Sequence, residues 1–184
     1  MVKYRSFGFC KKSVSLDFII AGFYMETITY RKAGPADVGL ILHFIHLMAE
    51  YEKLSSEVTA IEALLNEWIF QKGAAEVMFA MHEGQEVGFV LYFYNFSTFT
   101  GRAGLYVEDV FVLPQWRGRG IGRGIFRKLA DMAVEQGCGR MEWVCLDWNK
   151  PSIEFYKSLG ARPMDEWTVY RLTRQQLPRL AQPD

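Results

Sequence analysis

The chain has 184 residues, and its 21 Lys and Arg residues are balanced by 21 Asp and Glu residues, so its formal net charge is zero. Half of the residues are hydrophobic and 15% are aromatic, which is enough to bury the core of one domain and excludes a disordered chain. The zero charge lacks the basic excess of a phosphate-neutralising nucleic-acid binder, and no apolar run reaches the roughly 20 residues of a membrane helix. Three cysteines without metal-type spacing favour a reducing, cytoplasmic setting over a disulfide scaffold.

The charge is unevenly distributed along the chain. Residues 47–109 contain ten acids and three bases, a net charge of −7, whereas residues 110–128 contain five bases and no acid. This segregation is compatible with solvated surface charge, but it also suits a protein that handles a cation and an anion together.

Residues 1–24 differ from the rest of the chain. Basic residues precede a short apolar stretch at 18–24, as in a signal peptide, but Asp17 borders that stretch and no small-residue cleavage site follows it. We therefore expect residues 1–24 to be an extension, either disordered or adventitious, and residues 25–184 to form one domain.

Hydrophobic periodicity and turn signals predict alternating strands and helices in that domain. The expected strands are 27–31, 77–81, 86–96, 104–113, 141–146 and 167–172, and the expected helices are 35–53, 59–71, 120–136 and 150–159, with a short helix from Thr173. Thr59 and Glu62 have the spacing of a capping box, and residues 82–85 have the composition of a hairpin turn. This order predicts an α/β fold, a mixed central sheet with helices on both faces.

The clearest functional motif follows the strand at 104–113. A glycine-rich turn leads at once into an amphipathic helix, and the three arginines beside it are Arg117, Arg119 and Arg123. The remaining residues of this loop are Gly118, Gly120, Ile121 and Gly122. Glycines let the main chain approach a ligand closely, and the N–H groups at a helix start favour a phosphate. The motif is neither a Walker A loop nor a GxGxxG dinucleotide fingerprint, because the required Lys and the distant acid are missing.

These residues resemble the R-x-x-G-x-G/A signature of the GCN5-related N-acetyltransferases (GNAT), in which the loop holds the pyrophosphate of acetyl-CoA. A second stretch, residues 149–161, is similar to the N-x-x-[AS]-x-x-x-Y-x-x-x-G-[AF] segment of that family. The segments Ala49-Glu50-Tyr51-Glu52 and Val107-Glu108-Asp109-Val110-Phe111-Val112 resemble diamine (spermidine/spermine) and thialysine acetyltransferases within it. The resemblance implies a single GNAT domain with acetyl-CoA as co-substrate.

The resemblance also implies roles for individual residues. Glu108 would bind the amine and act as general base, with Asp109 as the alternative acid, because strand alternation places their side chains on opposite faces. Tyr156 would be the general acid for the leaving thiolate, and the remaining candidates fall into two groups. The cofactor contacts would be Val110, Phe111, Val112, residues 117–123, Asn149, Ser152 and Tyr156. Among them, the main-chain N–H groups of Phe111 and Val112 would hold the thioester carbonyl or the pantetheine. The substrate contacts would be Tyr51, Glu52, Glu108 and Asp109.

The predicted function is transfer of an acetyl group from acetyl-CoA to a small cationic amine, by direct attack in a ternary complex. A polyamine and a lysine-like amino acid both remain possible acceptors, and Lys53 or Arg102 could hold the carboxylate of the latter. The alternatives are a protein or peptide amine as acceptor, or a non-catalytic acyl-CoA sensor. We expect no metal site, because His43 and His46 lack a third ligand, no nucleic-acid or membrane partner, and a homodimer formed through the aromatic region 92–99.

Overall fold

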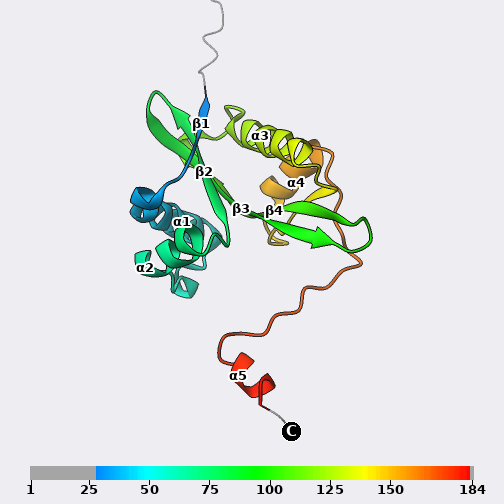
Figure 1. The fold of residues 1–184 in the computed structure, drawn as a ribbon. Coiled ribbons are helices and arrows are strands. Elements are labelled where there is room, and N and C mark those ends of the chain that lie inside the picture. The colour runs from blue at the N-terminus through cyan, green and yellow to red at the C-terminus, as the bar shows by residue number, and fades with distance from the viewer. Residues whose placement is uncertain (1–27, 183–184) are drawn as a thin grey trace, which may run out of the picture. The chain divides into compact units, whose positions relative to one another are not determined.

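The structure is a computed structural model that describes residues 28–182, and it divides the chain into two units, Met1–Glu142 and Trp143–Asp184 (Figure 1). The expected extension at 1–24 lies outside the described residues. The first unit contains nearly all of the sheet, and the second contains two helices.

The sheet has five strands in the order β1-β2-β3-β4-β5. These strands are β1 Thr29–Lys32, β2 Glu76–His82, β3 Gln85–Ser97, β4 Arg102–Val112 and β5 Arg140–Trp143. β1 pairs with β2, β2 with β3 and β3 with β4, each antiparallel, and the sheet as a whole is mixed. Glu83 and Gly84 connect β2 to β3 with φ values of 48° and 81°, as a tight hairpin turn between twisted strands requires. The predicted hairpin is confirmed.

Within the first unit, α1 Val38–Glu52 and α3 Ile121–Glu135 cover opposite faces of the sheet (Figure 1). The helical segments are η2 Pro35–Asp37, α1 Val38–Glu52, η3 Ser55–Glu57, α2 Glu62–Leu65, η4 Asn66–Gln71, η5 Pro114–Trp116, α3 Ile121–Glu135, α4 Lys150–Ser158 and α5 Leu177–Leu180. On the α1 face, Phe44 stacks on Phe89 with ring centroids 5.5 Å apart and also contacts Phe79. On the other face, a Cβ built on Gly88 would lie 3.5 Å from the Ile125 side chain of α3. The expected α/β fold with helices on both faces is confirmed.

The second helix differs from its prediction. The predicted cap, Thr59, does not start the helix. The helix begins at Glu62, and its N-cap residue, Ile61, makes no side-chain cap hydrogen bond. From Asn66 the backbone widens into a π-helix, in which Lys72 N–H donates to Glu67 O. Ile69 is buried in this wider turn, so tertiary packing rather than the local capping signal determines where the helix lies.

The last predicted strand, 167–172, is not formed. Its alternating side chains are exposed, with Trp167 at 70%, Val169 at 73% and Tyr170 at 92% of their full accessibility. A strand is stable only when a neighbour pairs its main-chain groups, and within its own unit this segment is accompanied by the helices α4 and α5. The expected strand 141–146 likewise ends at Trp143, and the short C-terminal helix begins at Leu177 rather than Thr173.

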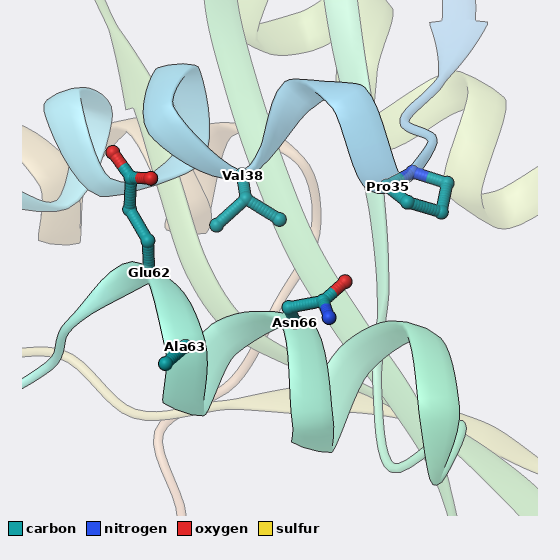
Figure 2. A pocket seen from close by; sticks show the side chains of 5 residues that line it. All are labelled: Pro35, Val38, Glu62, Ala63 and Asn66. Carbon is teal, nitrogen blue, oxygen red and sulfur yellow. The ribbon is translucent and has the colours of Figure 1, made fainter.

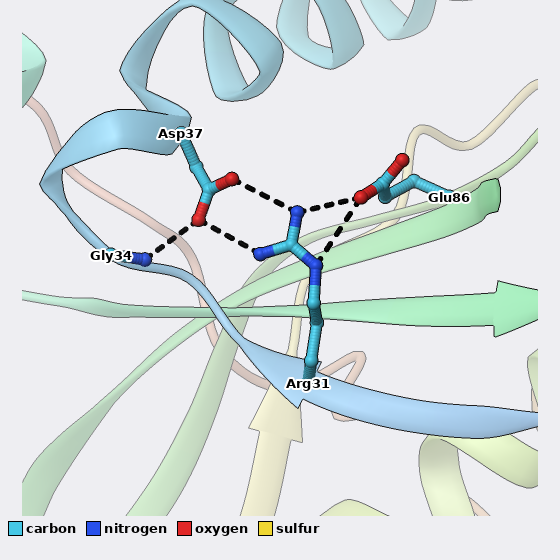
Figure 3. A network of polar contacts seen from close by, with 4 residues as sticks. All are labelled: Arg31, Gly34, Asp37 and Glu86. Atoms are coloured by element: carbon cyan, nitrogen blue, oxygen red, sulfur yellow. Dashed lines mark hydrogen bonds and ion pairs between the residues drawn. The ribbon is translucent and has the colours of Figure 1, made fainter. Parts of the chain in front are cut away.

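Arg31 of β1 ties together three segments of the first unit (Figure 3). Its guanidinium makes two parallel hydrogen bonds to Asp37, at 2.8 and 2.9 Å, and two more to Glu86, at 2.6 and 3.2 Å. It also lies over the Phe79 ring. Asp37 also accepts a hydrogen bond from Gly34 N–H at 2.8 Å. Arg31 holds the pKa of Asp37 below its usual range, chiefly through these hydrogen bonds. The start of α1 is thereby fixed to β1 and β3.

Replacing Arg31 by Met should lower the free energy of unfolding by about 1–3 kcal/mol, because it removes a two-pronged ion pair and leaves two half-buried carboxylates unpaired. Urea denaturation at pH 7 measures the effect. Lys32→Met is the matched control, since Lys32 is largely exposed and forms a single ion pair with Glu76. The contribution of Asp37 is present above pH ~4 and is lost as the pH falls through its lowered pKa, so the two variants should converge in acid. Equal losses at pH 7 would contradict this role for Arg31.

Candidate active site

A β-bulge in β4 determines where the two adjacent acids point. Leu91 of β3 pairs with Asp109, but its neighbour Tyr92 pairs with Val107, so Glu108 has no partner across the ladder. An extra residue in one strand breaks the strict alternation of faces. Asp109 therefore shares the α1 face with Phe111 of the core, whereas Val107 is opposite Tyr92 on the other face.

Two further carboxyl groups lie close enough to Asp109 at this bulge to affect its pKa. Asp109 is partly buried on β4, Glu108 beside it is exposed, and Glu52 comes from the last residue of α1. Burial, with smaller contributions from the charges of Glu108 and Glu52, raises the pKa of Asp109 to about 7. Burial also raises the pKa of Glu52. The site therefore contains a carboxyl group that can exchange a proton near neutral pH and an acidic environment that attracts a cation.

The end of β4 beyond the bulge has a main-chain edge that β3 does not use. Leu113 N–H donates to Val87 O at 3.0 Å, and antiparallel alternation directs Phe111 toward β3 as well. Val110 and Val112 therefore direct their main-chain groups to the opposite edge. On that side β5 starts beside Ala103, because Gly139 N–H donates to Ala103 O, and its four residues cover only about 13 Å. An extended ligand could therefore pair with the main-chain groups of Val110 and Val112, whereas those of Phe111 are directed toward β3.

The glycine-rich loop has the backbone geometry expected for an anion site. Gly118 and Gly120 have φ values of 76° and 81°, which residues with a Cβ rarely adopt. Gly120 is the N-cap of the 15-residue helix α3 and supplies no side-chain cap to its first turn. Arg119 lies over the ring of Trp116, 4.6 Å from its centroid. The helix start thus presents uncapped N–H groups next to cationic side chains, as a phosphate requires.

The side chain of Arg117 leaves the loop and turns back to the end of β4. Its Cζ atom is 4.5 Å from the ring centroid of Tyr51 and 5.1 Å from that of Phe111. Its Nε–H donates to Val112 O at 3.0 Å. Tyr51 in turn meets Phe111 edge to face, with centroids 6.4 Å apart. The structure therefore brings Tyr51, Glu52, the two adjacent acids and Arg117 into one region.

The second unit holds the other residues that the sequence singles out. Asn149 is 5% exposed and is the N-cap of α4, where its side-chain oxygen accepts the Ser152 N–H at 3.4 Å. These two residues therefore have a structural role in starting the helix, whatever they bind. Tyr156 is half-buried on α4, and its ring packs against Trp143 and Phe155 with centroids 5.2 and 5.5 Å away.

One hollow contains none of the residues that the sequence predicts for the site. It lies between the start of α1 and α2, has a volume of about 390 Å³ and is lined by Pro35, Val38, Glu62, Ala63 and Asn66 (Figure 2). The lining residues have no sequence signal beyond the misplaced capping box. Its polar groups are one carboxylate and one amide, which do not form a catalytic arrangement.

Two classes of site are not found in the described part of the chain. Within residues 28–182, no three His, Cys, Asp or Glu side chains are grouped so that they could hold a metal ion. None of the helices there has the length and apolar character needed to span a membrane. Arg102 also lies away from the site, because it begins β4 and donates to Gly137 O at the opposite end of the strand.

Residues 43–161 match the Acetyltransferase (GNAT) family. The chain is 38% identical to the thialysine N-epsilon-acetyltransferase of Sus scrofa over 169 residues, which cover 85% of this chain and 99% of that protein. It is 42% identical over 86 residues to the L-ornithine N5-acetyltransferase of Arabidopsis thaliana, covering 47% of this chain and 38% of that protein. An integron cassette protein from the mobile metagenome of V. cholerae has a TM-score of 0.71 and 26% identity, covering 85% of this chain and 98% of its own.

The family match includes the acidic bulge, the glycine-rich loop and the capped helix α4, which are the parts described above. It confirms the resemblance that the loop and the 149–161 segment indicate. The Sus scrofa relative is matched over nearly its whole length, so the likeness is not limited to one motif. This chain is an N-acetyltransferase that belongs to the GNAT family.

Proposed function

We propose that the protein transfers the acetyl group of acetyl-CoA to the side-chain amine of a small, lysine-like amino acid. The observation that carries the proposal is the acidic cluster at the β4 bulge, where the charges of Glu52 and Glu108 act on the partly buried Asp109. A cationic amine is attracted to such a cluster and must lose a proton before its nitrogen can attack.

The residues of the loop fit the diphosphate of acetyl-CoA. Two glycines with positive φ open the main chain, the start of α3 has no side-chain cap, and Arg119 and Arg123 add positive charge. Val110 and Val112 would pair with the extended arm of the molecule through their outward main-chain groups, and Val112 O would exchange its hydrogen bond from Arg117 for one from the ligand. Bound in this way, acetyl-CoA supplies an acetyl thioester at the end of β4. Asn149 and Ser152 are proposed as further contacts.

The names of two relatives support an amino-acid acceptor. One relative is a thialysine N-epsilon-acetyltransferase and the other an L-ornithine N5-acetyltransferase. Thialysine and ornithine are both amino acids with a second amine at the end of the side chain. A polyamine remains the second candidate, since it offers the same cationic amine to the same acids.

Proton removal from that amine requires a base near the β4 bulge. Glu108 is the base that the family resemblance predicts, and it is exposed. Asp109 has the two properties that suit the task better, partial burial and a pKa of about 7. We propose that Asp109 takes the proton from the acceptor ammonium, directly or through water, and that Glu108 holds the cation nearby. Tyr156 is proposed to donate a proton to the departing sulfur, because a phenol is protonated at neutral pH.

We also propose a cytoplasmic homodimer. The tip of the β3–β4 hairpin exposes Phe96 at 64% and Phe99 at 94%, an aromatic patch that a second copy could cover. Tyr92, which belongs to the same predicted patch, is instead buried and donates its hydroxyl hydrogen to Glu76.

The proposed function predicts release of free CoA thiol when acetyl-CoA is mixed with an amine panel of thialysine, lysine, ornithine, putrescine, spermidine and a lysine peptide. The amino acids should give the highest kcat/KM, because they are small cations whose side-chain amine fits the acidic cluster. If only the peptide reacts, the protein or peptide alternative is correct. Tight CoA binding without thiol release from any amine would indicate a non-catalytic sensor.

A second prediction concerns the loop glycine at the start of α3. Gly120→Leu should lower the affinity for CoA by about tenfold or more, because a side chain at a φ of 81° strains the loop and blocks the approach of a ligand. A Cβ at this position meets no protein atom within 4 Å, so steric damage to the protein itself is small. Isothermal titration with CoA measures the loss. Gly73→Leu, also at a positive φ but outside the loop, is the control for backbone strain alone; equal CoA affinities of both variants would place the cofactor elsewhere.

The third prediction separates the two acids of β4. At saturating substrates, kcat should rise with pH up to about 7 and then become constant, because Asp109 accepts a proton only when ionised. Asp109→Asn should lower kcat by about 100-fold or more and remove this dependence, whereas Glu108→Gln should mainly raise the KM of the amine. The opposite pattern would identify Glu108 as the base.

The same carboxyl has a measurable effect on stability. Folded Asp109 keeps its proton up to about pH 7, whereas an unfolded Asp loses it near pH 4, so its contribution to stability falls as the pH rises between these values. Asp109→Asn should therefore be more stable relative to the parent at pH 8 than at pH 4. Thermal unfolding at both pH values provides this readout without any substrate.

A further inference from the structure

The exposed arginine in the middle of the glycine-rich loop, Arg119, is connected to the sheet through the ring of Trp116. Its Cζ atom lies over that ring, 4.6 Å from the centroid. The same ring meets His82 at a centroid distance of 4.4 Å and an interplanar angle of 48°. His82 is the last residue of β2 and Trp116 the last residue of η5. These three side chains therefore connect the β2–β3 hairpin with the glycine-rich loop.

The sheet holds both residues that support this contact. His82 pairs with Gln85 beside the hairpin turn, so the β2–β3 ladder fixes its backbone. Trp116 is half-buried, and its N–H donates to Leu113 O at 2.8 Å, which closes the turn of η5. Leu113 N–H in turn donates to Val87 O of β3 at 3.0 Å. The tryptophan is thus anchored at the same end of the sheet as the hairpin.

The chain on either side of Arg119 does little to fix its side chain. Its neighbours are Gly118 and Gly120, and glycines give a backbone the widest choice of conformations. A long, exposed arginine side chain also has many rotamers to lose. Contact with the face of a ring restricts a guanidinium, whereas its N–H donors point outward along the edge of its plane. The Trp116 ring can therefore fix this cation and still leave its edge directed toward an anion.

We infer that Trp116, supported by His82, is a positioning residue that holds the guanidinium of Arg119 for the diphosphate of acetyl-CoA; this inference rests on the proposed function. A group that is fixed before its ligand arrives loses less entropy on binding, so the affinity is higher. Arg119 then adds a charge-assisted hydrogen bond to the N–H groups at the start of α3. Trp116 acts through Arg119 and not by contact with the reacting atoms.

The test is a double-mutant cycle on the affinity for CoA, measured by isothermal titration. Trp116→Leu should weaken CoA binding by about threefold to tenfold, the range expected for one cation–π contact. In the Arg119→Gln background the same substitution should have little further effect, because the group that Trp116 positions is gone. In the Arg123→Gln background, which removes a different cation beside the loop, the full loss should remain.

Conservative variants separate positioning from damage to the loop. Trp116→Phe keeps an aromatic face and should recover most of the affinity. His82→Ala should weaken CoA binding in the same direction by a smaller factor, whereas His82→Phe should keep the parent affinity. Trp68→Leu is the matched control, because Lys72 lies over that half-exposed ring on η4, 3.7 Å from its centroid. It should leave the affinity for CoA unchanged.

A truncated co-substrate provides a kinetic readout that a general disturbance of the site would not give. Acetylpantetheine has the thioester of acetyl-CoA and lacks its diphosphate. Trp116→Leu should therefore raise the KM of acetyl-CoA, and kcat/KM for acetylpantetheine should stay near the parent value. The KM of the amine should also be unchanged.

Several outcomes would overturn the inference. Equal losses from Trp116→Leu in the parent and in the Arg119→Gln background would show that the ring does not act through Arg119. Unchanged CoA affinity in Trp116→Leu or in Arg119→Gln would do the same, as would an equal loss of activity with acetylpantetheine. If the parent neither binds CoA nor releases thiol with any amine, the proposed function fails as well. A parent that binds CoA and gives an additive cycle loses this inference alone.

Discussion

One unpaired residue in a ladder of hydrogen bonds organises the proposed acceptor site. Because Glu108 has no partner on β3, the strand beyond it is shifted, and Asp109 joins Phe111 on the α1 face. Burying a carboxyl among apolar neighbours costs free energy, and here the cost is expressed as a raised pKa. A regular strand would place Asp109 on the same face as Val107 instead. The position of Asp109 beside Glu52 on this face follows from the irregularity.

The glycine-rich loop depends on a different constraint, the absence of side chains. Gly118 and Gly120 adopt backbone angles that are costly for other residues, and Gly124 lies one turn into α3, where a Cβ would overlap the Tyr30 hydroxyl of β1. The first two glycines shape the loop, whereas the third lets α3 pack directly on the sheet. The sequence motif of alternating glycines thus combines two independent requirements.

Most of the architecture could be predicted from periodicity, because buried stripes and hairpin turns are local signals. The bulge could not, since it is a property of the register between β3 and β4 and no residue type marks it. The same limit explains why Glu108 and Asp109 could be identified as a pair but not assigned to a buried and an exposed position. Residues 167–172 show the reverse error: a good strand pattern does not form a strand without a partner. Asn149 and Ser152 remain predicted cofactor contacts, and the structure adds that Asn149 caps α4 by accepting the Ser152 N–H.

The anchoring of α1 at one end has a mechanical consequence at the other. The Arg31 network holds the first turn, whereas Tyr51 and Glu52 lie at the last, 15 residues away. A helix of that length extends about 22 Å, so a tilt of only about 5° about its anchored end would move Glu52 by roughly 2 Å. Functional groups need to be held to within about 0.5 Å of their working geometry. The Arg31 ion-pair network therefore fixes the direction of α1, and with it the positions of Glu52 and Tyr51 relative to β4.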